Sequence, residues 1–298
     1  MKRPDEKNTY LQFIVSMVII GTIGVFRRYI PVSSAVLAFS RGILGSLSLC
    51  AFVKLRGQRI RHGIERSKVL LLILNGAIIG VNWIFLFEAY RYTTVAVATL
   101  CYYLQPTLLI LVSPVFFREK LTGRKLFFAM TAFAGMILVS GILRSGGTEG
   151  NNLRGVAFGL CAALLYTAAV IINKKVTGTD PFEKTIIQLA SAAIVLIPYI
   201  LLNEDITKIN TEPRTIILIL IVGVIHTGLV YLLYFGSMEH LKAQAVAILS
   251  YIDPVVAILA SWVFLRESIT VIELIGAVLI IGSAIMSERE PGNKEGNS

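Results

Sequence analysis

The stretch YYLQPTLLILVSPVFFREKLT, residues 102–122, recurs later in the chain as SYIDPVVAILASWVFLRESIT, residues 250–270. Pro106 and Pro254 mark the same position in the two copies, so the copies lie 148 residues apart (254 − 106). The same offset aligns the whole of residues 78–122 with the later copy. The chain therefore contains an internal repeat, and the repeated unit decides the fold.

Long apolar runs fill the chain from end to end. Of its 298 residues, 55% are hydrophobic and 15% are charged, and the mean hydropathy is +0.75. A soluble domain carries about a quarter charged residues, whereas a helix needs about 20 mainly apolar residues to cross a bilayer core of roughly 30 Å. We expect an all-α integral membrane protein with about ten spans, at residues 10–27, 34–53, 69–90, 95–117, 123–143, 153–173, 183–202, 214–237, 243–265 and 270–287.

Each copy of the repeat covers five predicted spans. Because five is odd, the second copy must enter the membrane from the opposite side, which makes this an inverted-topology repeat. We place the first repeat at residues 1–145 and the second at residues 150–288, followed by a disordered tail at residues 289–298. Many secondary transporters use inverted repeats to alternate access around a site near the bilayer midplane.

We attribute the formal net charge of +10 to basic residues in the connections on one side of the membrane, and not to a surface that binds nucleic acid. Lys and Arg concentrate in the N-terminal segment, the even-numbered connections and the tail, and an excess of these residues is typical of cytoplasmic loops. We therefore expect a multi-pass cell-membrane protein with both termini in the cytoplasm. Cys50, Cys101 and Cys161 lie inside apolar runs, and three widely spaced cysteines indicate no disulfide or metal framework.

The paired motifs YLQP…FFREKLT and YIDP…FLRESIT, the second followed by GAVLIIGSAIM, resemble the two EamA repeats of the drug/metabolite transporter superfamily. The resemblance covers essentially the whole chain and rests on the duplication of the motif. It implies a ten-helix fold, a central cavity between the halves, and transport, often export, of amino acids or related metabolites. Glu88, in the stretch LFEAY, is a departure, because relatives usually carry a small or apolar residue there.

Asp253 lies in the middle of the ninth predicted span, where a carboxylate costs roughly 2.5–3.5 kcal/mol. Such a group is normally paired, protonated or exposed to water, so we interpret Asp253 as a substrate or proton site, with a structural hydrogen bond as the alternative. Gln105 is its counterpart in the first repeat. Pro106 and Pro254 lack an N–H and interrupt helical hydrogen bonding, which favours either a pair of hinges beside a polar site or simple packing kinks.

Aromatic residues gather near the middle of the same spans. Trp83 and Tyr231 occupy equivalent positions in spans three and eight, and Tyr102, Tyr103 and Tyr251 lie in spans four and nine. An aromatic wall beside a carboxylate suits a substrate with an ammonium group, through cation–π contact and charge pairing. The alternative is that these rings fill gaps between helices.

Four more polar residues are candidates for the site. Arg41, inside the second span, is expected to neutralise Asp253 or Glu88, to bind a substrate carboxylate, or to extend to the membrane surface. Asn82 is a weaker candidate for substrate binding, and Glu88 and His226 join Asp253 as candidates for proton coupling. A hydrogen-bonded packing residue is the alternative for His226.

Together these features predict a secondary transporter that works by alternating access. Amino-acid export is the first choice, and export of amines or other small organic cations is the alternative. The expected partners are the lipid bilayer and a small-molecule substrate, without nucleic acid; a coupling proton and a homodimer stay open. No Gly-rich phosphate-binding motif, HExxH or GxSxG is present, so we expect no cofactor, metal or catalytic residue. A channel and an intramembrane enzyme are the alternatives from other classes.

Overall fold

A computed structural model describes residues 6–55, 64–92, 98, 101–139, 152–205, 212–266 and 270–288. Within these ranges the chain forms helices and turns without a β-strand, which confirms the all-α fold class. The tail predicted at residues 289–298 lies outside the described residues.

The helices of the first repeat are α1 (Glu6–Gly21), α2 (Ile23–Arg28), α3 (Ser34–Leu55), α4 (Arg66–Tyr92), α6 (Leu104–Phe117) and α7 (Gly123–Val139). Those of the second repeat are α8 (Asn152–Lys175), α9 (Pro181–Asn203), α10 (Pro213–Gly223), the π-helix η2 (Val224–Leu229), α11 (Val230–Met238), α12 (Ala243–Ser250), α13 (Ile252–Leu265) and α14 (Val271–Glu288).

Some passes through the bundle consist of more than one helix. α1 and α2 form one pass, α10, η2 and α11 form another, and α12 and α13 form a third, so the described helices make up ten passes. Seven helical stretches in the described part of the chain are long and apolar enough to span a membrane, and shorter apolar helices cover Leu104–Phe117 and Leu274–Ser283.

The helix boundaries repeat with the spacing found in the sequence. α6 and α13 begin 148 residues apart (252 − 104) and end 148 residues apart (265 − 117). Each is followed by an arginine in the left-handed conformation, Arg118 with φ 55° and Arg266 with φ 57°. A left-handed residue ends a helix and redirects the chain, so both repeats turn toward their last helix at the same point. This agreement confirms the two-repeat architecture.

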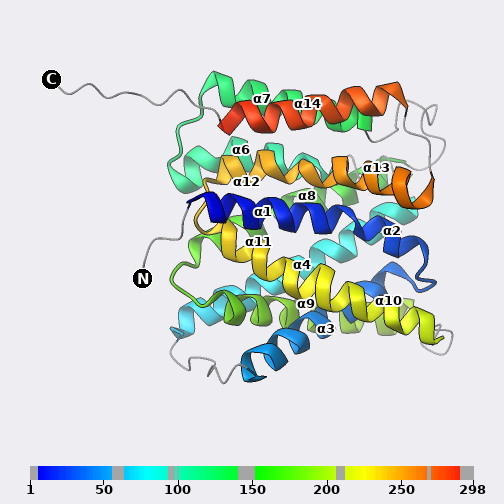
Figure 1. Cartoon of the computed structure of the whole chain (residues 1–298). Helices are drawn as coiled ribbons and strands as arrows, with labels where there is room; N and C mark the ends of the chain where they lie inside the picture. Colours follow the sequence, from blue (N-terminus) through cyan, green and yellow to red (C-terminus); the bar gives the residue numbers. More distant parts are fainter. Residues whose placement is uncertain are drawn as a thin grey trace.

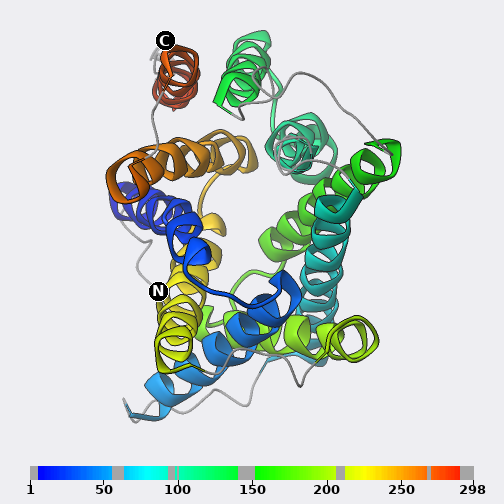
Figure 2. The ribbon, with the colours of Figure 1, turned by 90° about the vertical axis from the view of Figure 1, so that its right-hand side faces the viewer.

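The helices lie side by side, and Figure 1 shows the start of α1 and the end of α14 at the same end of the bundle. An even number of passes requires this arrangement, and we call this end the terminal end. Because successive passes alternate in direction, α6, α8 and α11 also finish there, and α9 and α12 begin there. α7 and α14 pack against each other at one edge of the bundle, as Figures 1 and 2 both show.

The two passes that contain the predicted hinge prolines are broken helices. α12 and α13 are separated by a turn at Tyr251, and the fourth pass has its turn at the equivalent Tyr103. Pro106 and Pro254 are each the third residue of the helix that follows. A missing N–H breaks no helical hydrogen bond in a first turn. The helices therefore break at the tyrosines and restart before the prolines, while hinge motion stays a prediction.

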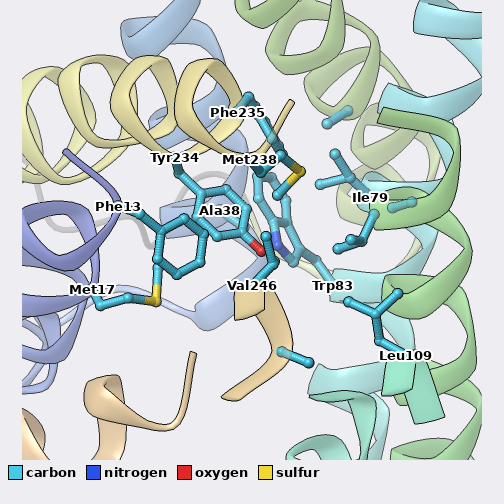
Figure 3. Close-up of a cluster of buried hydrophobic side chains, with 14 of the residues drawn as sticks. Phe13, Met17, Ala38, Ile79, Trp83, Leu109, Tyr234, Phe235, Met238 and Val246 are labelled. Atoms are coloured by element: carbon cyan, nitrogen blue, oxygen red, sulfur yellow. The ribbon is translucent and has the colours of Figure 1, made fainter. Parts of the chain in front are cut away.

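The largest apolar core lies where the two repeats meet. Figure 3 shows Phe13 and Met17 of α1 facing Tyr234 of α11, with Trp83 of α4 beyond the tyrosine ring. The ring centroids of Phe13 and Tyr234 are 5.3 Å apart, and Met238 at the end of α11 is fully buried in the same core. Phe13 and Met238 belong to the terminal halves of their passes, so part of this core fills the terminal half of the bundle, while Ile30 and Ile200 extend it along the opposite half.

Glycines allow α4 to lie directly on α9. A Cβ on Gly76 would be 2.3 Å from the carbonyl oxygen of Gln188, and a Cβ on Gly80 would be 2.7 Å from that of Ala192. In lipid, close backbone approach between small residues supplies the packing that holds helices together. The α4–α9 contact is therefore a tightly packed part of the scaffold.

We expect Gly76→Ala to destabilise the protein by about 1–3 kcal/mol, because overpacking a tight contact forces backbone shifts. This loss opposes the gain of roughly 0.5–1 kcal/mol that alanine brings to a helix. Gly282→Ala in α14 is the matched control, since a Cβ there would meet no atom within 4 Å. Thermal unfolding in detergent should show a lowered midpoint only for Gly76→Ala; equal midpoints would contradict the close packing.

Candidate functional site

A cavity of about 890 Å³ lies between the two repeats. Helices α1 to α4 and α6 contribute to its wall from the first repeat, and α8, α11, α12 and α13 from the second. The residues on this wall that were predicted from the sequence are Arg41, Trp83, Tyr102, Tyr103, Gln105, Pro106, Tyr231 and Asp253.

The cavity extends from the middle of the bundle to the end opposite the termini. Arg27, Arg28 and Ser34, which belong to its wall, lie at the end of α2 and the start of α3, and Arg28 is exposed. Tyr166 and Ser250, also on the wall, lie near the middle of their passes. The cavity is therefore open at the end opposite the termini, and apolar residues fill the bundle at the terminal end.

Asp253 contributes a carboxylate to the cavity wall from the first turn of α13. The hydroxyl of Tyr103 donates a hydrogen bond of 2.6 Å to its Oδ2 atom, and within the described residues Oδ1 has no hydrogen-bond partner. The positive end of a helix dipole favours a carboxylate in the first turn, so the break at Tyr251 provides Asp253 with a helix N-terminus. One carboxylate oxygen is left for a ligand.

Two tyrosines connect the helix breaks of the two repeats. The hydroxyl of Tyr251 lies 2.8 Å from that of Thr107 and donates a 3.2 Å hydrogen bond to the carbonyl oxygen of Tyr103. Tyr103 in turn holds Asp253, so each repeat contacts the break of the other. Tyr251 is fully buried and does not line the cavity. In this conformation Tyr251 lies behind the cavity wall, where this junction occupies its hydroxyl, and its part in substrate binding stays a prediction.

Aromatic rings from both repeats line the cavity together with Asp253. Tyr102 stacks on Tyr166, with ring centroids 5.6 Å apart and planes inclined by 3°. Trp83 and Tyr231 complete this aromatic wall. Tyr166 was not predicted, because it lies in α8, outside the repeated motif; a lone tyrosine inside an apolar span is the signal that was available.

Arg41 lines the cavity from α3 and is held on two sides. Its Nε atom donates a 2.9 Å hydrogen bond to the hydroxyl of Thr227, and its Cζ atom lies 5.8 Å from the centre of the Trp83 ring. Among the contacts of the described residues, Arg41 pairs with neither Asp253 nor Glu88, so the expected neutralisation is not found. Thr227 lies in η2 and was not predicted, because nothing in the residue pattern indicates a π-turn.

Asn82 and His226 pack between helices and are not part of the cavity wall. Asn82 is 1% exposed, and its side-chain amide donates a 2.6 Å hydrogen bond to the carbonyl oxygen of Ala162. The Nε2 atom of His226 lies 3.0 Å from the hydroxyl oxygen of Thr22, and its ring meets Phe26 edge-on at 4.6 Å. Asn82 therefore lies outside the cavity wall in this conformation, and its part in substrate binding stays a prediction. His226 fits the alternative of a packing residue.

Glu88 also lies outside the cavity wall. Its Oε1 atom accepts hydrogen bonds from Arg91 at 2.9 Å and from the hydroxyl of Tyr199 at 2.6 Å. This pairing explains why α4 tolerates a carboxylate at position 88, where members of the family that the sequence resembles usually carry a small or apolar residue. Its predicted role in proton coupling stays a prediction.

Polar contacts hold the terminal end of the bundle together. The carboxylate of Glu119, just after α6, accepts hydrogen bonds of 2.7 and 3.2 Å from the first two backbone N–H groups of α12. Lys174, near the end of α8, donates hydrogen bonds to the carbonyl oxygens of Met238 and Leu241. Acidic groups at helix starts and basic groups at helix ends are both favoured by the helix dipole. The first of these contacts joins the two repeats.

Comparison with known proteins identifies the family from both halves of the chain. The sequence profile of the EamA-like transporter family matches residues 7–141 and again residues 153–288. The chain belongs to the EamA-like transporter family. This EamA protein is therefore a multi-pass membrane transporter and not an enzyme.

Several relatives of this EamA protein are transporters by name. It is 31% identical over 293 residues to the uncharacterized transporter YxxF of Bacillus subtilis (strain 168), covering 97% of this chain and 92% of the relative. It is 27% identical over 234 residues to a probable amino-acid metabolite efflux pump of Salmonella typhimurium, covering 73% and 77%. A crystal structure with 18% identity has a TM-score of 0.84, covering 95% of this chain and 98% of that chain, which shows a shared fold.

Proposed function

We propose that this EamA transporter exports amino acids or closely related metabolites by alternating access. The observation that carries this proposal is the carboxylate of Asp253 in a cavity that is open at one end of the bundle and closed at the other. An ionisable group at membrane depth that faces a cavity marks a substrate or ion site by default. The surroundings of Asp253 indicate which chemical group it binds.

Asp253 and the rings that share its cavity are suited to an ammonium group. The Oδ1 atom is available, and the rings of Tyr102, Tyr231 and Trp83 line the same cavity. A cation over an aromatic ring gains about 0.5–2 kcal/mol, more when both are desolvated. The carboxylate supplies the opposite charge, so contacts in the site replace the interactions with water that an ammonium group loses when it binds.

The contacts at the terminal end act as the closed gate. Glu119 ties the end of α6 to the start of α12, and Lys174 ties α8 to the end of α11 and to the segment that follows it. For the cavity to open toward that end, these hydrogen bonds must break while others form at the opposite end. Inverted repeats provide two such states, because each half can adopt the conformation of the other.

The positive-inside prediction gives this cycle a direction. It places the terminal end in the cytoplasm, so the cavity of this structure faces outward. An exporter then loads substrate when the terminal gate is open and releases it from the conformation described here. The Salmonella relative whose name is probable amino-acid metabolite efflux pump supports export.

Asp253 is also the proposed proton site. A single carboxylate binds either a proton or an ammonium group, so an incoming proton displaces an outgoing substrate. Such competition couples export to a proton gradient, because the two ligands use the same group on opposite halves of the cycle.

Export of small amines is the second candidate. Asp253 and the aromatic wall recognise an ammonium group, and these two features require no other charged group on the substrate.

Counterflow in proteoliposomes tests the proposal. Purified protein is reconstituted into liposomes, and the liposomes are loaded with an unlabelled compound. The entry of radiolabelled amino acids, choline and polyamines is then measured, one compound at a time. We expect saturable entry of amino acids that is accelerated by unlabelled amino acid on the far side, as a carrier requires. Flux that does not saturate would favour a channel, and the absence of amino-acid flux would contradict amino-acid export.

A further inference from the structure

Arg41 places a positive group in the cavity that the proposed ammonium site does not use. It is half-buried in α3 and lines the cavity. Its Nε atom is bonded to Thr227, and within the described part of the chain its two terminal nitrogens have no hydrogen-bond partner. An arginine inside a membrane bundle is costly and is retained where it binds something. The unpaired end of the guanidinium therefore points to an anionic ligand.

The contacts of Arg41 fix the direction in which the guanidinium presents its donors. The ring of Trp83, 5.8 Å from Cζ, and the hydroxyl of Thr227, 2.9 Å from Nε, restrict the side chain from two directions. A guanidinium is a planar fork with five N–H donors. When Nε is occupied, the two terminal nitrogens can still donate parallel hydrogen bonds to both oxygens of one carboxylate.

The π-helix η2 explains why Thr227 accepts the hydrogen bond from Arg41. The hydroxyl of Thr227 donates to the carbonyl oxygen of Val222, five residues earlier, at 3.0 Å. Its only proton is used in this bond, so its lone pairs are left to accept from Nε of Arg41. Thr227 itself is fully buried, which keeps the hydroxyl in this orientation. π-turns frequently occur at functional sites. This one places the hydroxyl of Thr227 where it holds the side chain of Arg41 in the cavity wall.

We propose that Arg41 binds the carboxylate of the substrate while Asp253 binds its ammonium group, with Thr227 as the positioning residue for Arg41. This inference rests on the proposed transport of amino compounds and narrows it to zwitterionic amino acids. Arg27 and Arg28 also line the cavity, so among the described residues a simple amine would meet three arginines and one carboxylate. A zwitterion matches both signs of charge.

The tryptophans allow binding to be measured directly. Trp83 and Trp262 are the two tryptophans of the chain, and Trp262 is 55% exposed on α13. In a Trp262→Phe background, the emission of Trp83 therefore reports on the surroundings of Arg41. L-leucine, L-leucinamide and isoamylamine are the probes, because they share one apolar side chain and differ in the carboxylate. The apolar residues Met17 and Leu37 on the wall suit that side chain.

L-leucine is expected to bind at least about tenfold more tightly than leucinamide or isoamylamine, because a charge-assisted hydrogen-bonded pair is lost with the carboxylate. Arg41→Gln should abolish this preference. Thr227→Val, which keeps the shape but lacks the hydroxyl, should weaken L-leucine about tenfold and leave isoamylamine unchanged. Thr227→Ser restores the hydroxyl and should restore the preference, which a purely structural role of Thr227 would not explain.

Two results would overturn the carboxylate assignment. One is equal binding of L-leucine and isoamylamine by the Trp262→Phe protein, and the other is equal weakening of both by Thr227→Val. Either result leaves saturable counterflow of amino compounds intact as evidence for the carrier. Failure of the proposed function is a different outcome, in which the proteoliposomes show no counterflow of any amino acid.

Discussion

Asp253→Asn is expected to reduce amino-acid counterflow by at least about 100-fold, because removing one partner of a buried charge pair costs about 3–5 kcal/mol. The amide has nearly the same shape as the carboxylate and still accepts a hydrogen bond from Tyr103, so the fold should be unaffected. It has no negative charge for an ammonium group and cannot be protonated near neutral pH. Uphill accumulation driven by a pH gradient should therefore disappear together with counterflow.

Glu88→Gln is the matched control for Asp253→Asn. Glu88 is a second carboxylate of the membrane-spanning helices, but it lies outside the cavity wall and is bonded to Arg91 and Tyr199. If Glu88 has no part in coupling, its amide variant keeps counterflow within about twofold of the unmodified protein, a change smaller than one hydrogen bond contributes. Normal accumulation by Asp253→Asn would show that neither the substrate nor the proton needs this carboxylate.

Lys184→Met is expected to destabilise the protein by about 3–5 kcal/mol, as breaking a buried ion pair does. Lys184 is 1% exposed, and its Nζ atom donates 2.8 Å hydrogen bonds to the carbonyl oxygens of Asn173 and Val176. It also lies 3.5 Å from the carboxylate of Glu239. These carbonyls at the end of α8 lack helical partners, so the methionine would leave both of them, and Glu239, without the donor.

Lys175→Met is the control for the loss of a lysine from the same end of the bundle. Lys175 is exposed, and its Nζ atom lies 4.9 Å from the centre of the Phe116 ring. A cation–π contact at an exposed site contributes less than about 1 kcal/mol. The thermal unfolding midpoint in detergent should fall strongly for Lys184→Met and little for Lys175→Met. A similar midpoint for both variants would show that Lys184 is not an anchor of the terminal end.

The fold could be predicted because the chain contains two copies of the same repeat. A membrane pass is visible as an apolar run, and the constant offset between Pro106 and Pro254 fixed which passes correspond. The same offset reappears in the ends of α6 and α13. Helix boundaries depend on local chemistry, so this level of structure follows from residue order with little tertiary information.

The direction in which side chains point could be predicted less well. Depth in the membrane follows from position along a span, and Trp83, Tyr102 and Asp253, which were selected by their depth, line one cavity. The rotation of each helix is set by packing between helices, so Tyr251 and Asn82, at suitable depth, turned out to face other helices. Local departures from helical geometry, such as the π-turn that contains Thr227, arise from the same packing.

The tyrosine junction between the helix breaks has a consequence for the energetics of a transport cycle. In this structure Tyr103 of the first repeat holds the side chain at position 253, which is an aspartate. If the opposite-facing state exchanges the conformations of the repeats, Tyr251 would reach the equivalent position 105, which is a glutamine. Asp253 would then have a tyrosine hydroxyl as a partner in only one of the two states. Binding of a proton or a substrate to Asp253 would therefore shift the equilibrium between the outward-facing and inward-facing states. Symmetry supplies the two states, and the difference between Gln105 and Asp253 supplies a bias.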